Sequence, residues 1–171
     1  MKTVVMIIAE KIFRDEEYQV PKEILTKAGI KVITASTTTG EAVGKLGLKV
    51  KPDILVSQVV IDGLDALIFI GGGGASQYFN DPLAHSLAKQ AAEKGKIYGA
   101  ICIAPIILAN AGLLKGKRAT VFPSPDGIEA LKKGRANYTA GDVEVDGKLI
   151  TGCGPEAAKK FGEALIKMLR P

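Results

Sequence analysis

Short apolar segments alternate along this chain with longer segments of helical periodicity, and this alternation constrains the fold more than any other feature. Strands covered on both faces are apolar almost throughout. Segments of that kind span residues 3–9, 30–35, 65–70 and 97–101, and helical spacing is found between them at 17–28 and 81–93. We therefore expect an α/β protein in which a mostly parallel sheet lies between two layers of helices, a three-layer α/β/α sandwich.

The remaining segments fit a single domain of residues 1–171, because about 150 residues is usual for one domain. Asp81 followed by Pro82 is typical of a helix start. The pair Asp146-Gly147 predicts a two-residue turn between antiparallel strands, whereas residues 43–56 alternate weakly and predict an irregular hairpin. Further strands are expected at 118–122, 143–145 and 149–151, and further helices at 105–111, 126–133 and 155–169.

Composition excludes several classes of function. The chain has 23 Lys and Arg against 18 Asp and Glu, a net charge of +5, but the cations are interleaved with acids. No basic block contains aromatic residues, so we expect no nucleic acid partner. One His and two Cys exclude Cys₄ and Cys₂His₂ zinc sites, and we expect no metal. The acidic residues 15–17 would repel a flavin phosphate, and we expect no cofactor.

The apolar stretches are too short for a membrane span. The longest, residues 97–109, is interrupted by Tyr98, Gly99 and Pro105, and a span needs about 20 residues. The N-terminal apolar run has no small-residue cleavage site before the acidic cluster, so it is interpreted as a first strand rather than a signal peptide. We expect a cytoplasmic protein with no membrane partner.

Cys102 stands where a buried strand passes into a helix. Ligand sites of parallel α/β sheets lie beyond the carboxyl ends of the strands. Ala100 and Ala104 are small, as a sharp strand-to-helix turn requires, and Pro105 suits the first helical turn. The turn would place the Cys102 sulfur at a helix N-terminus, which favours a thiolate. The alternative is an inert buried cysteine.

A second feature of the same edge is the run Gly71-Gly72-Gly73-Gly74, which follows a buried strand. Its backbone N–H groups are candidates for an oxyanion site near Cys102. It is no Walker loop, because no Gly-Lys-Ser/Thr follows, and it opens no immediate helix as a dinucleotide-binding loop would. The alternative is a flexible tight turn.

Five segments together resemble the DJ-1/PfpI superfamily, also called ThiJ/PfpI, over nearly the whole chain. They are Phe13–Glu17 with Pro21, Asp65–Gly72, Ala100–Pro105, Ala111–Lys117 and Thr151–Pro155. The resemblance implies a flavodoxin-like sandwich, a homodimer or higher homo-oligomer, and a reactive cysteine at Cys102. It also implies a glutamate that hydrogen-bonds this cysteine, and the matching position is Glu17.

A buried thiol beside a carboxyl group should share a proton with it, since two adjacent negative charges repel each other. We expect the pKa of Glu17 to be raised, that of Cys102 to be lowered, and the pair to titrate as a unit. The N–H groups of Gly72 and Ile103 are the expected donors to an oxygen on or near the sulfur. Phe122, Cys153, Gly154 and Pro155 are expected to line the pocket, and the backbone of Gly71, Gly72 and Gly73 is expected to hold the oxygen of a substrate.

The chain departs from the family pattern at the positions of its histidines. Peptidase-like members resemble one another in a Cys-His pair, where this chain has Ile103, and members likened to a glyoxalase place a histidine in the slot of Phe122. His85 is mid-helix and is interpreted as a surface or packing residue. Cys153 is interpreted either as a small buried side chain or as a resolving thiol for oxidised Cys102.

Three functions remain open. The first is hydrolytic chemistry on small reactive carbonyls, of the glyoxalase or deglycase kind, with Cys102 as nucleophile and Glu17 as proton shuttle. The second is an intracellular cysteine peptidase acting on peptides, which the absence of a histidine at the elbow disfavours. The third is a non-catalytic oxidation sensor or chaperone-like stress protein. Modification of the thiol or turnover of an aldehyde or a peptide would discriminate among them.

Overall fold

A seven-stranded sheet forms the centre of the molecule in the computed structural model, which describes residues 1–171. Its strand order is β11-β12-β8-β7-β1-β3-β6, and every neighbouring pair is parallel except β11–β12. The strands of this sheet are β1 (Thr3–Ile7), β3 (Lys31–Ser36), β6 (Ile54–Leu55), β7 (Ala66–Phe69), β8 (Ile97–Ile101), β11 (Val143–Asp146) and β12 (Leu149–Gly152). The predicted α/β fold with a mostly parallel sheet is confirmed.

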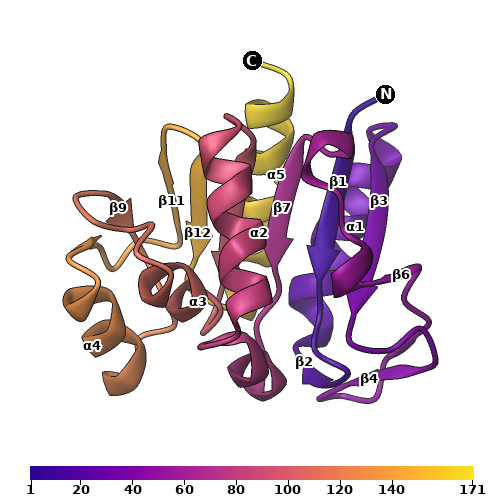
Figure 1. Cartoon of the computed structure of the whole chain (residues 1–171), viewed down its shortest axis with the longest axis horizontal. Helices are drawn as coiled ribbons and strands as arrows, with labels where there is room; N and C mark the ends of the chain where they lie inside the picture. Colours follow the sequence, from indigo (N-terminus) through magenta and orange to yellow (C-terminus); the bar gives the residue numbers. More distant parts are fainter.

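Helices cover both faces of the sheet (Figure 1). They are α1 (Asp15–Lys27), α2 (Pro82–Glu93), α3 (Pro105–Asn110), α4 (Pro125–Lys133) and α5 (Ala158–Leu169). Successive β1 side chains serve different cores: Val5 and Ile7 belong to the core under α2 and α3, and Val4 and Met6 to the core under α1 and α5. The alternation follows from the two-residue period of a strand, and it explains why such strands are apolar throughout.

Local sequence signals account for several boundaries. The Asp81 carboxylate caps α2 by accepting a hydrogen bond from the Leu83 N–H at 3.1 Å, with Pro82 in the first turn. Gly95, at φ +69°, lies just beyond the end of that helix, where a left-handed residue satisfies the last carbonyls. The predicted hairpin around Asp146-Gly147 is present as β11 and β12.

Three expectations differ from the structure. The strand predicted at 118–122 is only β9 (Arg118–Ala119), which pairs with β10 (Asn137–Tyr138) outside the main sheet. It stops early because the Phe122 N–H donates to the Cys102 carbonyl at 2.7 Å rather than to a strand. The last helix begins as a 3₁₀ turn at Pro155–Ala157. Residues 43–56 contain the expected hairpin, β4 (Ala42–Gly44) and β5 (Lys49–Val50), but also β6, which joins the main sheet.

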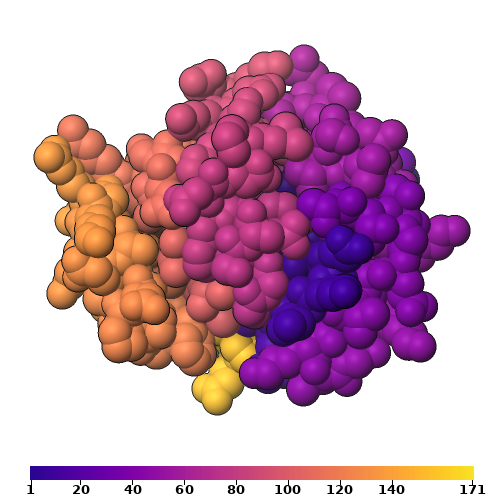
Figure 2. Space-filling model, turned by 60° about the horizontal axis from the view of Figure 1, so that its bottom comes forward, coloured from indigo at the N-terminus to yellow at the C-terminus, as the bar shows by residue number.

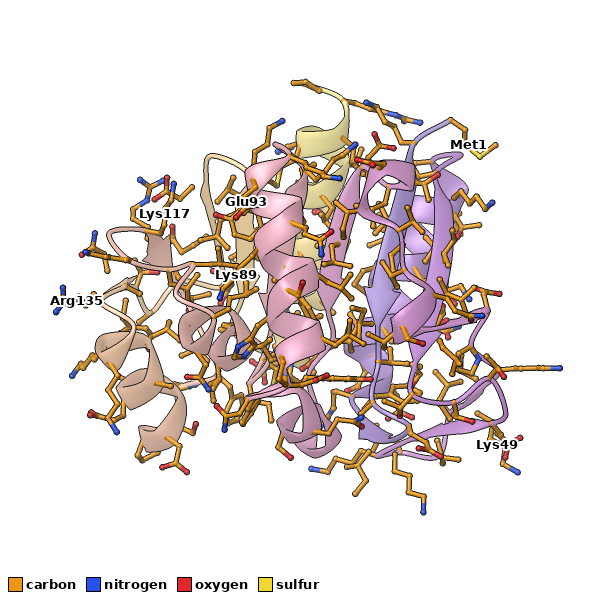
Figure 3. The ribbon with its side chains drawn as sticks, in the orientation of Figure 1. Met1, Lys49, Lys89, Glu93, Lys117 and Arg135 are labelled. Carbon is orange, nitrogen blue, oxygen red and sulfur yellow. The ribbon has the colours of Figure 1, made fainter.

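A small sheet of β2 (Lys11–Phe13), β4 and β5 lies near the carboxyl end of β1. Charged side chains extend outward around the molecule, with Lys49 and Arg135 at opposite edges (Figure 3), whereas Asp15 and Glu17 are buried. No helix combines the length and the apolar composition that a membrane crossing requires.

Candidate active site

Cys102 occupies a strained turn between β8 and α3. Its φ is +65°, a left-handed conformation that non-glycine residues rarely adopt. The Ala104 N–H donates to the Ile101 carbonyl at 3.1 Å and closes the turn, and Ala100 and Ala104 are completely buried. Larger side chains at these two positions would find no space. The strand–turn–helix geometry predicted for Cys102 is therefore present, and it leaves the residue 8% exposed.

The glycine loop is closely packed rather than flexible. A Cβ on Gly71 would lie 2.6 Å from both the Cys102 Cβ and the Glu17 Oε1. A Cβ on Gly72, whose φ is +97°, would lie 2.4 Å from the Arg14 nitrogen, and one on Gly74 would lie 1.8 Å from the Lys11 carbonyl oxygen. Only Gly73 has room for a side chain. Three of these glycines are thus required because the segment 11–14, Glu17 and Cys102 approach the loop so closely.

Glu17 is fully buried in α1 and faces the glycine loop. Its Oε1 accepts a hydrogen bond from the Gly71 N–H at 3.1 Å. Its Oε2 is buried and has no partner of normal hydrogen-bond geometry. The Cys102 thiol and this carboxyl group nevertheless interact electrostatically. Cys102 lowers the pKa of Glu17, and Glu17 raises the pKa of Cys102.

Burial raises the pKa of Glu17 to about 7, against the smaller opposing effects of Cys102, Gly71 and Arg14. Burial also raises the pKa of Cys102 to about 12, and the charge of Glu17 adds to this. The expectation of a lowered Cys102 pKa is therefore wrong. Two backbone N–H groups lower the pKa of Cys102, but their effect is smaller than the increase caused by desolvation. The pair holds two protons below pH about 7 and shares one above it.

The backbone N–H groups of Gly72 and Ile103 lower the pKa of the Cys102 thiol. They lie on different segments, the glycine loop and the turn after β8, so the tertiary fold brings them together. The sequence suggested the same two groups as donors to an oxygen on or near the sulfur, and that role stays a prediction. The geometry gives Cys102 a carboxyl neighbour on one side and N–H donors for negative charge on the other.

Two neighbours of the site were not predicted from the sequence. Arg14, directly before α1, makes a two-point ion pair with Glu16 at 3.0 and 2.9 Å, and its charge lowers the pKa of Glu17. Ile12 has a φ of +61°, is 52% exposed and lies against Gly72 and Gly73. Arg14 belongs to the motif that contains Glu17, and this proximity was the available signal. No sequence signal indicates the strained Ile12.

The expected pocket residues also lie at this edge. The Phe122 N–H bonds the Cys102 carbonyl, its side chain is 41% exposed, and its ring lies 3.3 Å from the Cβ position of Gly154. Cys153 is half-buried, and Pro155 opens the next turn. Figure 2 shows this face, where indigo residues of the N-terminal region lie beside magenta residues of the middle of the chain.

His85 lies elsewhere. Its Nε2 bonds the Phe79 carbonyl at 2.8 Å from within α2, so the imidazole is engaged in packing at the start of that helix. No group of three or more His, Cys, Asp or Glu side chains is arranged to hold a metal ion. Glu17 and Cys102 are thus the two titratable groups that the fold brings together at the elbow.

Known proteins resemble this chain in both sequence and structure. The sequence model described as the DJ-1/PfpI family matches residues 2–168. The chain belongs to the DJ-1/PfpI family. A ThiJ/PfpI domain protein from Brachyspira murdochii superposes with a TM-score of 0.94 at 32% identity, covering 98% of this chain and 95% of that one.

Relatives within the DJ-1/PfpI family carry different names. An uncharacterized protein of Methanocaldococcus jannaschii is 42% identical over 97% of this chain and 82% of its own length. A protein of Pyrococcus abyssi named a deglycase is 30% identical over 97% of this chain and 99% of its own length. Family membership thus fixes the fold and leaves the reaction to be argued from the site.

Proposed function

We propose that this protein is an enzyme that converts small 2-oxoaldehydes or related reactive carbonyl compounds, with Cys102 as nucleophile and Glu17 as its proton acceptor and donor. The observation that carries the proposal is the pairing of a strained elbow cysteine with a fully buried carboxyl group whose pKa is raised to about 7. A carboxyl group poised near neutral pH is suited to both halves of a proton shuttle. Three archaeal relatives named deglycases support the same class of substrate.

The first step is attack of the Cys102 sulfur on the aldehyde carbon. The ionised Glu17 takes the thiol proton as the carbon–sulfur bond forms, which overcomes the raised pKa of the thiol. Negative charge develops on the former aldehyde oxygen, and the N–H groups of Gly72 and Ile103 are the nearest backbone donors for it. Glu17 then returns the proton to this oxygen, which gives a hemithioacetal and leaves Glu17 ionised for the next step.

For a 2-oxoaldehyde the reaction then balances without any external oxidant. Glu17 moves the proton of the former aldehyde carbon to the neighbouring carbon, and the hydroxyl proton of the hemithioacetal passes to the ketone oxygen. The first carbon is thereby oxidised to a thioester, and the ketone is reduced to an alcohol. Water hydrolyses the thioester, releases a 2-hydroxy acid and restores the thiol. One carboxyl group must serve every proton transfer, so turnover should be slow.

The surroundings of the sulfur favour a small substrate with an apolar substituent. Cys102 is only 8% exposed, and the exposed large hydrophobic side chains beside the glycine loop and the elbow are Ile12 and Phe122. A peptide bond would be a poorer substrate, because its amine leaving group needs a proton donor and Ile103 stands where peptidase-like members have histidine. The site therefore favours a carbonyl substrate over a peptide, because no histidine follows Cys102 to protonate an amine leaving group.

The test is incubation of the reduced protein with methylglyoxal, phenylglyoxal or glyoxal, followed by chromatographic measurement of the hydroxy acid. We expect product from the wild type, loss of at least about 100-fold in Cys102→Ser and Glu17→Gln, and unchanged activity in His85→Gln. Undiminished turnover by Cys102→Ser would overturn the proposal, as would the absence of hydroxy acid. Casein cleavage that requires Cys102 would favour a peptidase instead.

A further inference from the structure

One strained residue beside the site takes no part in the proposed proton transfers. Three non-glycine residues have a positive φ. Cys102 forms the elbow, and Arg135 follows α4, where a left-handed residue commonly ends a helix. The third is Ile12, with a φ of +61°. A β-branched side chain is poorly suited to this conformation, so the strain at Ile12 destabilises the fold unless packing compensates for it.

Packing does not compensate for this strain. Ile12 is 52% exposed and belongs to neither hydrophobic core. The pairing of β2 with β4 shifts between Lys11 and Phe13, so Ile12 is an extra residue in β2, a β-bulge. Glycine is the usual residue where a bulge requires a left-handed conformation. An isoleucine at this position therefore costs stability, and about half of its side chain remains in water.

The bulge places the Ile12 side chain beside the glycine loop. Its Cγ2 would lie 3.6 Å from a Cβ on Gly73, and its carbonyl oxygen would lie 2.5 Å from a Cβ on Gly72. The Gly72 N–H acts on the Cys102 sulfur, and a Cβ on Gly71 would lie 2.6 Å from the Cys102 Cβ. Two residues of chain span at most about 7 Å, so a substrate bonded to the sulfur can extend as far as Ile12.

We propose that Ile12 is a specificity-determining residue of the site, and that its side chain binds the substituent on the ketone of a 2-oxoaldehyde by apolar contact. The substrate class is thereby narrowed to 2-oxoaldehydes with a branched alkyl or phenyl substituent, as opposed to glyoxal, which has none. This inference rests on the proposed function, because it names the substrate of the same site. Strained residues concentrate at ligand-binding sites, where the lost stability is offset by function.

The surroundings of the sulfur leave the solvent side for such a substituent. Glu17 is fully buried, and the N–H groups of Gly72 and Ile103 would hold the substrate oxygen, so the substituent extends outward. Ile12 and Phe122 are the exposed large hydrophobic side chains on that side, and of the two only Ile12 has a positive φ. Each methylene group that the contact buries is worth about fourfold in affinity.

The first test compares kcat/KM for isopropylglyoxal and for glyoxal, with the hydroxy acid products measured by chromatography. The ratio of the two values should fall at least about fivefold in Ile12→Asn and in Ile12→Ala, and by less in Ile12→Val, which keeps the branched shape. The loss should appear in KM for isopropylglyoxal, while kcat for glyoxal stays within about twofold of the wild type. A ratio that is unchanged in both Ile12→Asn and Ile12→Ala would overturn the role of Ile12.

A second measurement requires no turnover and separates this inference from the proposed function. Alkylation of Cys102 by N-cyclohexylmaleimide and by N-methylmaleimide is followed by peptide mass spectrometry, and each rate is divided by the rate with free glutathione. The preference of the wild type for the cyclohexyl reagent should fall at least about fivefold in Ile12→Asn. A fall in this preference without hydroxy acid from any 2-oxoaldehyde would refute the carbonyl reaction and support Ile12 as the apolar contact. Hydroxy acid formation with both ratios unchanged would refute the role of Ile12 alone.

Val60→Asn is the matched control. Val60 is also β-branched and is 68% exposed, but it precedes β7 outside the site and has an extended φ of −114°. Both ratios should be unchanged in this variant. Asparagine tolerates the left-handed conformation, so Ile12→Asn should unfold at a higher guanidinium chloride concentration than the wild type, whereas Val60→Asn should not. An equal fall in the unfolding midpoint of both variants would show that packing offsets the strain at Ile12, and would overturn the argument for its function.

Discussion

Replacing Glu17 by Gln should change how the stability of the protein depends on pH. Burial moves the pKa of this carboxyl group from 4.5 to about 7 in the folded protein. A carboxyl group with a raised folded-state pKa stabilises the protein below its unfolded pKa, and this contribution is lost as the pH rises through the folded pKa. At 1.36 kcal/mol per pH unit, ionising Glu17 costs the folded state about 3 kcal/mol between pH 4.5 and pH 8.

Glutamine carries no charge, so the Glu17→Gln variant should lose this pH dependence. The assay is guanidinium chloride unfolding followed by circular dichroism at pH 5, 6, 7 and 8. We compare the change in unfolding free energy between pH 5 and pH 8 in the two proteins, because any loss that does not vary with pH then cancels. The wild type should lose about 2.5 kcal/mol more than Glu17→Gln over this range, because part of the change has already occurred below pH 5.

Glu16→Gln is the matched control. Glu16 is the next residue in the chain, but Arg14 lowers its pKa, so it stays ionised between pH 5 and pH 8 and should leave the slope unchanged. The same slope in the wild type and Glu17→Gln would refute the assignment of Glu17. A wild type that becomes more stable as the pH rises would indicate a Cys102 thiolate with a lowered pKa, because the sign of that linkage is opposite.

Three further predictions concern the site and its support. Alkylation of Cys102 by iodoacetamide, followed by peptide mass spectrometry, should accelerate as the pH passes about 7, where Glu17 begins to accept the thiol proton; persistence of this inflection in Glu17→Gln would contradict the shuttle. Gly71→Ala should destabilise the protein by about 1–3 kcal/mol, since its Cβ would lie 2.6 Å from Cys102 and Glu17, whereas Gly73→Ala should unfold at nearly the wild-type denaturant concentration. Asp15→Ala should cost about 2 kcal/mol in unfolding free energy, because the buried carboxylate accepts hydrogen bonds from the Leu46 and Leu48 N–H groups at 2.9 and 2.8 Å. Asp126→Ala, at an exposed acid, should change stability far less, and equal losses would show that the buried bonds contribute little.

The raised pKa of both groups changes how the elbow should be understood. A short helix of six residues and two N–H donors do not stabilise a free thiolate in a buried position. In the proposed reaction the nucleophile is generated when Glu17 takes the thiol proton, so activity and Cys102 reactivity should follow the ionisation of Glu17. The homodimer implied by the family resemblance stays a prediction.

The strand and helix pattern could be predicted from sequence because it depends on residues that are close along the chain. The apolar strands, the Asp81 cap and the Asp146-Gly147 turn each follow from spacing and local chemistry. The position of Cys102 between Ala100 and Ala104 indicated a sharp turn in the same way, and its positive φ agrees. The place of Glu17 at the site was predicted from the family resemblance, because no local pattern distinguishes this residue from its acidic neighbours.

Contacts between distant segments were decided by the tertiary structure. Gly71 and Glu17 are 54 residues apart in the chain, and their hydrogen bond and shared burial exist only after folding. The direction of the Cys102 pKa shift depended on how far water is excluded from the sulfur, which no local sequence records. The register of β8 and β12, which sets Gly152 opposite Ile101, is likewise fixed by packing of the whole sheet. Local spacing determines which elements form and where the elbow falls, whereas desolvation and register arise from the assembled core.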